Sequence, residues 1–375
     1  MKYISFLLGL FFAFRCISPA DINAVKPDAI LAVNGFITDQ PGPYRIRIDR
    51  LSRFTGVRGE EGTTRFEQNV RVRILDDLGR VTPVERVTIT DKIVYDADPP
   101  GCVEASEFIT VLSTNYRTPK DFIGEVGRTY TIEIEENDGK MYRSTPQTML
   151  PTPPINSIDF RFTEIPTTGT LRSGVEVYAE FQDPAGENYY FWQVNGIYRI
   201  FTPQSNQPEG CCLFDPVDQR ADKCWILERN VSGNTLALSD RLFDGQTTRQ
   251  LAGIVEDDGI RFANPTTGSE QQYHVELLQH NMSLEAFAYN ERIGNLREIN
   301  GELFDPLPIS VGGNLYNVEN PNDPIIGFFG AYGVQTKSMF INRDILSFVQ
   351  PFPGPCGDCR VRPGAQVEVP EPYRR

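Results

Sequence analysis

Residues 44–51 have the sequence Tyr-Arg-Ile-Arg-Ile-Asp-Arg-Leu (YRIRIDRL), in which apolar and charged side chains alternate. Because successive side chains of an extended strand point to opposite faces, this period of two predicts a strand with one buried and one solvated face. Residues 70–75 (VRVRIL) and 130–135 (YTIEIE) follow the same rule. The latter run continues into Asn-Asp-Gly-Lys at 137–140, which is a hairpin signal. The three stretches together predict antiparallel β-structure.

The same pattern, read along the whole chain, predicts an all-β protein of two domains. We expect an N-terminal immunoglobulin-like antiparallel β-sandwich over residues 27–150, because short strands recur there without a helical period. A Pro-rich linker at 151–158 should follow, since Pro-Thr-Pro-Pro cannot join a sheet. A larger, mostly-β C-terminal domain is expected over 159–350, with one short helix that Ser283 can cap. The tail, 351–375, is expected to be irregular.

Composition and charge exclude several classes of function. The chain has 375 residues, 40% of them hydrophobic, and a formal net charge of −14. This is a globular composition with enough apolar residues for two cores. An acidic surface repels nucleic acid, and it also disfavours peripheral binding to anionic lipid. Attachment to a membrane would therefore need a covalent anchor or a protein partner.

The N-terminus has the features of an export signal. A run of about a dozen apolar residues after Lys2 is too short to span a bilayer, so residues 1–20 are interpreted as a signal peptide. Two cleavage sites compete. A lipoprotein peptidase could cut before Cys16 and leave that thiol diacylated, although Arg15 is an unusual residue at that position. An ordinary signal peptidase could instead cut after Ala20. The local residues do not decide between them.

Six further cysteines suggest disulfides in an oxidising compartment. They are Cys102, Cys211, Cys212, Cys224, Cys356 and Cys359. The short gap from Cys212 to Cys224 predicts one local bridge. Cys356 and Cys359 could pair with each other, or one of them could pair with Cys102. Prolines around the Cys-x-x-Cys motif argue against a redox site, and the spacing fits zinc poorly. We expect no metal and no cofactor.

The sequence contains few residues that are suited to catalysis. The two histidines, His274 and His280, have no supporting acidic motif, and the end of a strand is expected between them. The acidic run Glu256-Asp257-Asp258 is expected to be a solvated turn rather than a catalytic carboxylate pair. Tyr190 and Trp192 lie in an aromatic-rich strand that could either stack on a ligand or belong to the core. We therefore predict that the protein is not an enzyme.

Several stretches resemble, in the same order, one family of Bacteroidota envelope lipoproteins, catalogued as domain of unknown function 4249. They cover most of the chain after the signal peptide: 31–44 (LAVNGFITDQPGPY), 124–142 (GEVGRTYTIEIEENDGKMY), 155–158 (INSI), the helix after Ser283, 301–306 (GELFDP), 313–314 (GN), 327–329 (GFF) and 356–360 (CGDCR).

The resemblance implies an all-β outer-membrane lipoprotein that works beside a TonB-dependent transporter. Members usually carry a lipidated cysteine after a short signal, which favours Cys16 as the anchor, and no catalytic residues carry over. The expected function is a non-enzymatic accessory role in docking or substrate capture. The alternative is direct binding of a glycan or peptide by a surface lipoprotein. Whether the protein faces the periplasm or the cell exterior stays open.

Overall fold

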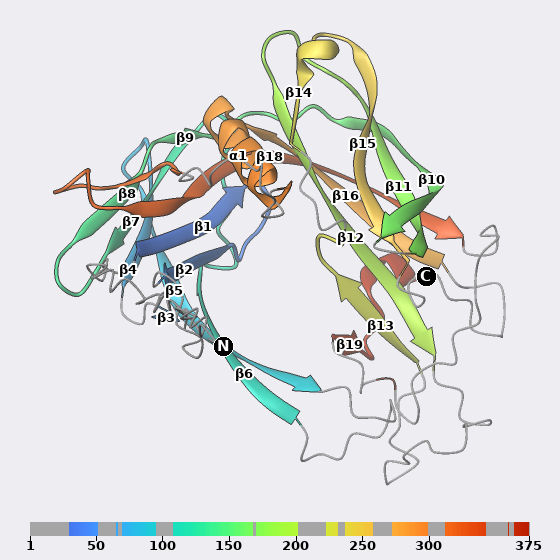
Figure 1. Ribbon diagram of the computed structural model, residues 1–375, viewed down its shortest axis with the longest axis horizontal. Coiled ribbons are helices and arrows are strands. Elements are labelled where there is room, and N and C mark those ends of the chain that lie inside the picture. The colour runs from blue at the N-terminus through green and yellow to red at the C-terminus, as the bar shows by residue number, and fades with distance from the viewer. Residues whose placement is uncertain are drawn as a thin grey trace, which may run out of the picture.

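The computed structural model describes residues 30–51, 65–66, 70–94, 108–167, 170–201, 223–231, 237–257, 272–298, 312–342, 359 and 364–374. Strands dominate these residues, and the one α-helix among them is α1 (Leu284–Glu298) (Figure 1). The prediction of an all-β fold with one helix is confirmed. The immunoglobulin-like character of the N-terminal half stays a prediction. None of the helices among the described residues is long and apolar enough to cross a membrane.

The strands of the N-terminal half pair with their neighbours in an antiparallel sense. They are β1 (Ile30–Thr38), β2 (Arg45–Leu51), β3 (Arg65–Phe66), β4 (Arg71–Asp76), β5 (Val81–Val94), β6 (Phe108–Arg117), β7 (Thr129–Glu135), β8 (Met141–Ser144) and β9 (Gln147–Thr148). The order across the sheet is β8-β7-β4-β5-β6-β2-β1. The alternating stretch 44–51 contributes β2, in which Ile46 and Ile48 are buried as expected.

The predicted hairpin is also present. β7 and β8 pair antiparallel, and the Glu136 N–H donates to the Lys140 carbonyl at 2.9 Å. Gly139 in this turn has φ +90°, a left-handed conformation that glycine adopts without a steric cost. The Asp-Gly pair therefore lies in the turn of the hairpin, as the sequence predicts.

The C-terminal half contains two sheets. Its elements are β10 (Ile155–Thr167), β11 (Thr170–Gln182), β12 (Tyr189–Phe201), β13 (Lys223–Glu228), β14 (Ala237–Ser239), η2 (Asp240–Leu242), β15 (Thr247–Glu256), β16 (Gln272–Met282), β17 (Leu315–Asn317), β18 (Ile325–Asn342), β19 (Ala365–Gln366) and η5 (Glu371–Tyr373). The sheet β10-β11-β15 stands apart from the sheet that contains β18-β16-β12-β13-β19. Phe181 of β11 packs against Tyr190 and Trp192 of β12, so a second hydrophobic core joins these sheets.

Strand β18 connects the two halves (Figure 1). Its first part pairs with β1 from Leu31↔Ile325 to Thr38↔Tyr332, and its second part pairs with β16. The pairing with β1 is parallel, so the predicted antiparallel arrangement does not hold at this place. The register needs Gly327, which has φ +112° and whose Cβ would lie 1.8 Å from the Val33 carbonyl oxygen. The N-terminal sheet is therefore completed by a strand from near the end of the chain.

Helix α1 covers the junction between the halves. The Ser283 Oγ accepts a hydrogen bond from the Ala286 N–H at 3.2 Å, so Ser283 caps the helix as predicted. Tyr289 stacks on Phe328 of β18 with ring centroids 5.1 Å apart, and Phe287 stacks on Tyr189 of β12. These rings belong to a third buried cluster, which holds the helix against both halves.

The Pro-rich segment 151–154 forms no strand and packs between the halves. The Thr152 hydroxyl donates to the Gly333 carbonyl at 2.6 Å and accepts from the Asn281 N–H at 3.1 Å. The tail is not irregular throughout, because β19 pairs with β13 and η5 follows it. The segment and the tail are thus both tied to the larger sheet.

Candidate functional site

The two aromatic residues proposed as a ligand platform lie in the core. Tyr190 and Trp192 are both 0% exposed. The Tyr190 hydroxyl donates to Asp183 Oδ1 at 2.6 Å, and the Trp192 indole N–H donates to Gln279 Oε1 at 2.9 Å. Since both polar atoms are satisfied inside the protein, the structure supports the core interpretation of this strand.

The cysteines pair differently from the prediction. Cys224 of β13 forms a disulfide with Cys359, which lies 135 residues away in sequence. The expected bridges from Cys212 to Cys224 and from Cys356 to Cys359 are therefore wrong, and Cys359 does not reach Cys102. The reason is that β19 pairs with β13 and brings Cys359 beside Cys224. A bridge from Cys356 to Cys102 would lie outside the described residues. The remaining cysteines lie outside the described residues: Cys16, Cys102, Cys211, Cys212 and Cys356.

Both histidines are buried in β16, which continues through Met282, so the expected end of the strand before Asn281 is wrong. His280 stacks on Phe191 with ring centroids 4.1 Å apart, and neither ring nitrogen has a hydrogen-bond partner. Burial lowers the pKa of His280 to about 3 and also lowers the pKa of His274. The imidazoles are therefore neutral parts of the core.

The acidic turn is only partly described. Glu256 forms an ion pair with Arg172 at 2.6 Å, and the Asp257 N–H donates to the Ser173 carbonyl at 2.8 Å. Both contacts join β15 to β11. Asp258 lies outside the described residues. The two described residues thus contribute to the edge of the sheet.

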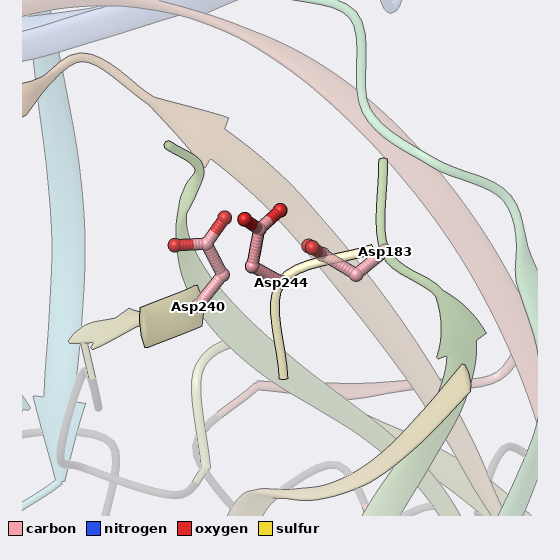
Figure 2. A group of neighbouring side chains, drawn as sticks. All are labelled: Asp183, Asp240 and Asp244. Atoms are coloured by element: carbon pink, nitrogen blue, oxygen red, sulfur yellow. The ribbon is translucent and has the colours of Figure 1, made fainter. Parts of the chain in front are cut away.

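Three aspartates that the sequence analysis did not single out converge between β11 and β15. Figure 2 shows the carboxylates of Asp183, Asp240 and Asp244 turned toward one another, and ligand atoms of all three lie within 4.8 Å of one another. Asp183 and Asp240 are buried. Burial raises the pKa of Asp183, hydrogen bonds from Tyr190 and Gly245 oppose this, and the other two negative charges add to it. The cluster therefore concentrates negative charge in a partly dry site.

The hydrogen bonds of this cluster hold neighbouring loops together. Asp240 accepts from the Asn188 N–H at 2.7 Å, and Asp244 accepts from the Gly186 N–H at 2.8 Å. The Gly245 N–H donates to Asp183 at 3.0 Å. Carboxylates are the ligands that Ca²⁺ and Mg²⁺ prefer, but the contacts shown account for these side chains as acceptors of backbone N–H groups. The turn signals Asp-Pro at 183 and Asp-Gly at 244 predict loops, but not that the loops meet.

A charged pocket of about 220 Å³ lies at one end of the N-terminal sheet. It is lined by Ile74, Asp76, Arg80, Thr82, Asp121, Phe122, Ile123, Glu125 and Tyr130. Two segments form most of it: the turn between β4 and β5, and the loop between β6 and β7. The sequence does not predict this pocket, because the two segments lie about 40 residues apart and each one alone has the composition of an ordinary polar turn.

Arg80 links the two segments of the pocket. Its guanidinium donates to Asp76 and, at 2.8 Å, to Glu125 Oε1. The hydrogen bond from Arg80 lowers the pKa of Glu125. Burial raises the pKa of Asp76, but the hydrogen bonds and charge of Arg80 outweigh burial and hold it below its ordinary value. The pocket therefore contains ionised carboxylates at neutral pH, and one guanidinium bridges two of them.

The comparisons with known proteins identify one family. The sequence model described as "Domain of unknown function (DUF4249)" matches residues 17–338. No curated protein and no solved structure matches the chain. Because the family match covers most of the chain, from the residue after Cys16 to the C-terminal part of β18, this protein belongs to the DUF4249 family.

Proposed function

We propose that the protein is a non-enzymatic lipoprotein of the cell envelope, anchored to the outer membrane through Cys16. The observation that carries the proposal is the extent of the family match, which begins at residue 17. Cleavage before Cys16 would leave the whole matched region on the anchored chain. The diacyl group of such a cysteine would provide a stable membrane attachment that the acidic surface cannot supply.

Within the envelope, we propose an accessory role beside a TonB-dependent transporter, in docking or substrate capture. This role comes from the family resemblance. A binding role is supported by the burial of His274 and His280, because a general acid or base must reach its substrate. The engagement of Glu256 by Arg172 supports it further. The charged pocket offers a place for a partner to bind.

One purification tests both parts of this proposal. The full chain, tagged at its C-terminus, is recovered from mildly solubilised outer membranes, and its intact mass and its co-purifying proteins are measured by mass spectrometry. We expect a mature chain that starts at a diacylglyceryl-Cys16 and carries a TonB-dependent transporter with it. The Cys16→Ala variant should be recovered without the lipid mass.

Two results would count against the proposal. A mature chain that starts at Asp21 would exclude the anchor, since cleavage after Ala20 discards Cys16. Recovery of the lipidated protein alone, also after chemical cross-linking in intact cells, would exclude the transporter as a stable partner.

The alternative function is direct capture of a peptide or glycan by a surface lipoprotein. The burial of Tyr190 and Trp192 removes the platform first considered for it. The charged pocket replaces that platform, and its carboxylates favour a cationic ligand over a neutral sugar. Saturable binding of a small guanidinium compound such as agmatine, abolished in Asp121→Asn, would favour this alternative.

A further inference from the structure

The two segments that form the charged pocket are held firmly in place. In the turn between β4 and β5, the Asp76 carboxylate accepts from the backbone N–H groups of Leu78 and Arg80 at 3.0 and 2.8 Å. The Asp77 N–H donates to the Thr129 carbonyl at 3.0 Å, which ties this turn to β7. The pocket is therefore built by backbone contacts and does not depend on the exposed ion pair alone.

The loop between β6 and β7 is tied down on its other side. The Gly124 N–H donates to the Thr38 carbonyl at 2.9 Å, and the Gly127 N–H donates to the Met149 carbonyl at 2.8 Å. Gly124 packs so closely that a Cβ there would lie 2.7 Å from the Thr38 oxygen. Side chains on this loop thus project in directions that the fold determines.

Three side chains on these two segments are apolar and face solvent. Leu78 is 59% exposed, Ile123 is 50% exposed and Val126 is 45% exposed. Single exposed apolar residues are common, but these three lie on the two joined segments that form most of the pocket, and Ile123 itself lines it. Hydrogen bonds hold the backbone of both segments in place, so these side chains start from fixed positions at the surface. This arrangement is typical of a surface that another molecule covers.

The charges of the pocket select the partner. Its lining has three carboxylates, Asp76, Asp121 and Glu125, and one guanidinium, Arg80, a formal balance of −2. Arg80 bridges Asp76 and Glu125, and Arg128, outside the lining, also donates to Glu125 at 3.4 Å, whereas Asp121 has no contact in that network. The pocket is smaller than the 300–1,000 Å³ typical of small-molecule sites. It is therefore suited to a single basic side chain.

We propose that this end of the N-terminal sheet is a docking surface for a polypeptide segment that presents an arginine or lysine between apolar residues. The basic side chain enters the pocket and pairs with Asp121, and the flanking apolar side chains cover Leu78, Ile123 and Val126. Arginine is one of the residues enriched in interface hot spots, where surrounding contacts exclude water from the anchoring side chain. The identity of the partner as a transporter rests on the proposed function; the docking surface itself does not.

The direct test uses the full chain and the capped tripeptide acetyl-Leu-Arg-Leu-amide, followed by isothermal titration calorimetry and by NMR. We expect saturable binding that weakens at least about tenfold in Asp121→Asn and in the double variant Leu78→Ser/Ile123→Ser. Two matched controls lie elsewhere: Leu171→Ser, at a leucine that is 65% exposed, and Asp138→Asn, at an exposed turn. Both should bind like the parent chain, and thermal unfolding should confirm that every variant is folded.

Three results would overturn the docking surface. The first is the absence of saturable binding at millimolar peptide. The second is equal binding of acetyl-Leu-Glu-Leu-amide, which would show that charge does not select the ligand. The third is agmatine binding as tightly as the tripeptide, which would indicate a site for a small cation.

Purification from solubilised outer membranes separates this inference from the proposed function. If the parent chain recovers a transporter and the variant Leu78→Ser/Asp121→Asn recovers equally much, the docking surface is wrong while the accessory function stands. If the parent chain binds the tripeptide but recovers no transporter, the surface stands and the proposed partner is wrong. Loss of the transporter in the variant alone supports both.

Discussion

At the scale of single residues, several polar side chains in the core form hydrogen bonds with one another. Tyr190 and Asp183 satisfy each other in the core, as do Trp192 and Gln279. His280 differs, because it lies against Phe191 with both ring nitrogens unpaired. A buried imidazole without a partner is tolerated only in its neutral form. The free-energy cost of burying the His280 imidazole therefore depends on pH.

We predict that His280 makes the protein sensitive to acid. Its pKa is about 3 in the folded chain and near 6.5 when unfolded, so below pH 6.5 the unfolded chain binds a proton that the folded chain cannot. Stability is complete above pH 6.5 and falls as the pH drops toward 3, by about 1.4 kcal/mol per pH unit. In urea unfolding, His280→Leu should lose about 2 kcal/mol less than the parent between pH 7.5 and 5.

The control for this prediction lies in the same aromatic cluster. Phe36 contacts His280 with ring centroids 5.7 Å apart and does not titrate. Phe36→Leu should lower stability equally at both pH values and keep the parent's acid dependence. An unchanged pH dependence in His280→Leu would show that the loss comes from His274 or from carboxylates.

At the scale of elements, the connection between the halves depends on one parallel strand pair. β18 joins β1 on one side and β16 on the other, so both cores use its side chains. Phe329 belongs to the N-terminal core and Ile341 to the C-terminal core. A destabilising substitution in β18 should therefore lower the stability of both halves together.

We predict that Gly327→Ala breaks this connection. The residue has φ +112°, and its new Cβ would lie against the Val33 carbonyl, so β1 and β18 must move apart. Gly139→Ala is the matched control, since Gly139 has φ +90° but open space around it. The control should cost about 1–2 kcal/mol from backbone strain, and Gly327→Ala at least about 2 kcal/mol more. If denaturant unfolding shows that both variants lose the same free energy of unfolding, the β1–β18 contact contributes little to stability.

At the scale of the whole molecule, the N-terminal sheet is not made from the N-terminal sequence alone. β17 pairs with β8 at one side of the sheet, and β18 pairs with β1 at the other. Leu315, Phe329 and Ala331 complete the first core. Both sides of the sheet are thus completed by strands from the C-terminal half of the chain.

We predict that residues 27–150 do not fold as an isolated fragment. Without β17 and β18, β1 would have an unpaired edge and the core would lack apolar side chains, two conditions that favour aggregation over folding. Near-ultraviolet circular dichroism and urea unfolding should show no cooperative transition for this fragment, while the mature full-length chain unfolds cooperatively. A native-like, cooperative fragment would show that the N-terminal half is autonomous.

The local features of this protein follow from short stretches of its sequence. The period of two in residues 44–51 places Ile46 and Ile48 inside, the Asp-Gly pair at 138–139 turns the chain, and Ser283 starts the helix. Each of these features depends on residues within one strand, turn or helix start. The resemblance to the family rests on the same kind of local stretch, and the match over 17–338 confirmed it.

Which distant segments meet could not be predicted from such stretches and is seen in the folded chain alone. The β1–β18 pair, the Cys224–Cys359 disulfide, the three-aspartate cluster and the charged pocket all join residues from separate parts of the chain. The alternation of apolar and charged residues predicts which face of a strand is buried, but it does not predict which strand lies beside it. The choice of partner depends on how all apolar faces pack at once, because the free energy of a long-range contact is shared among many residues.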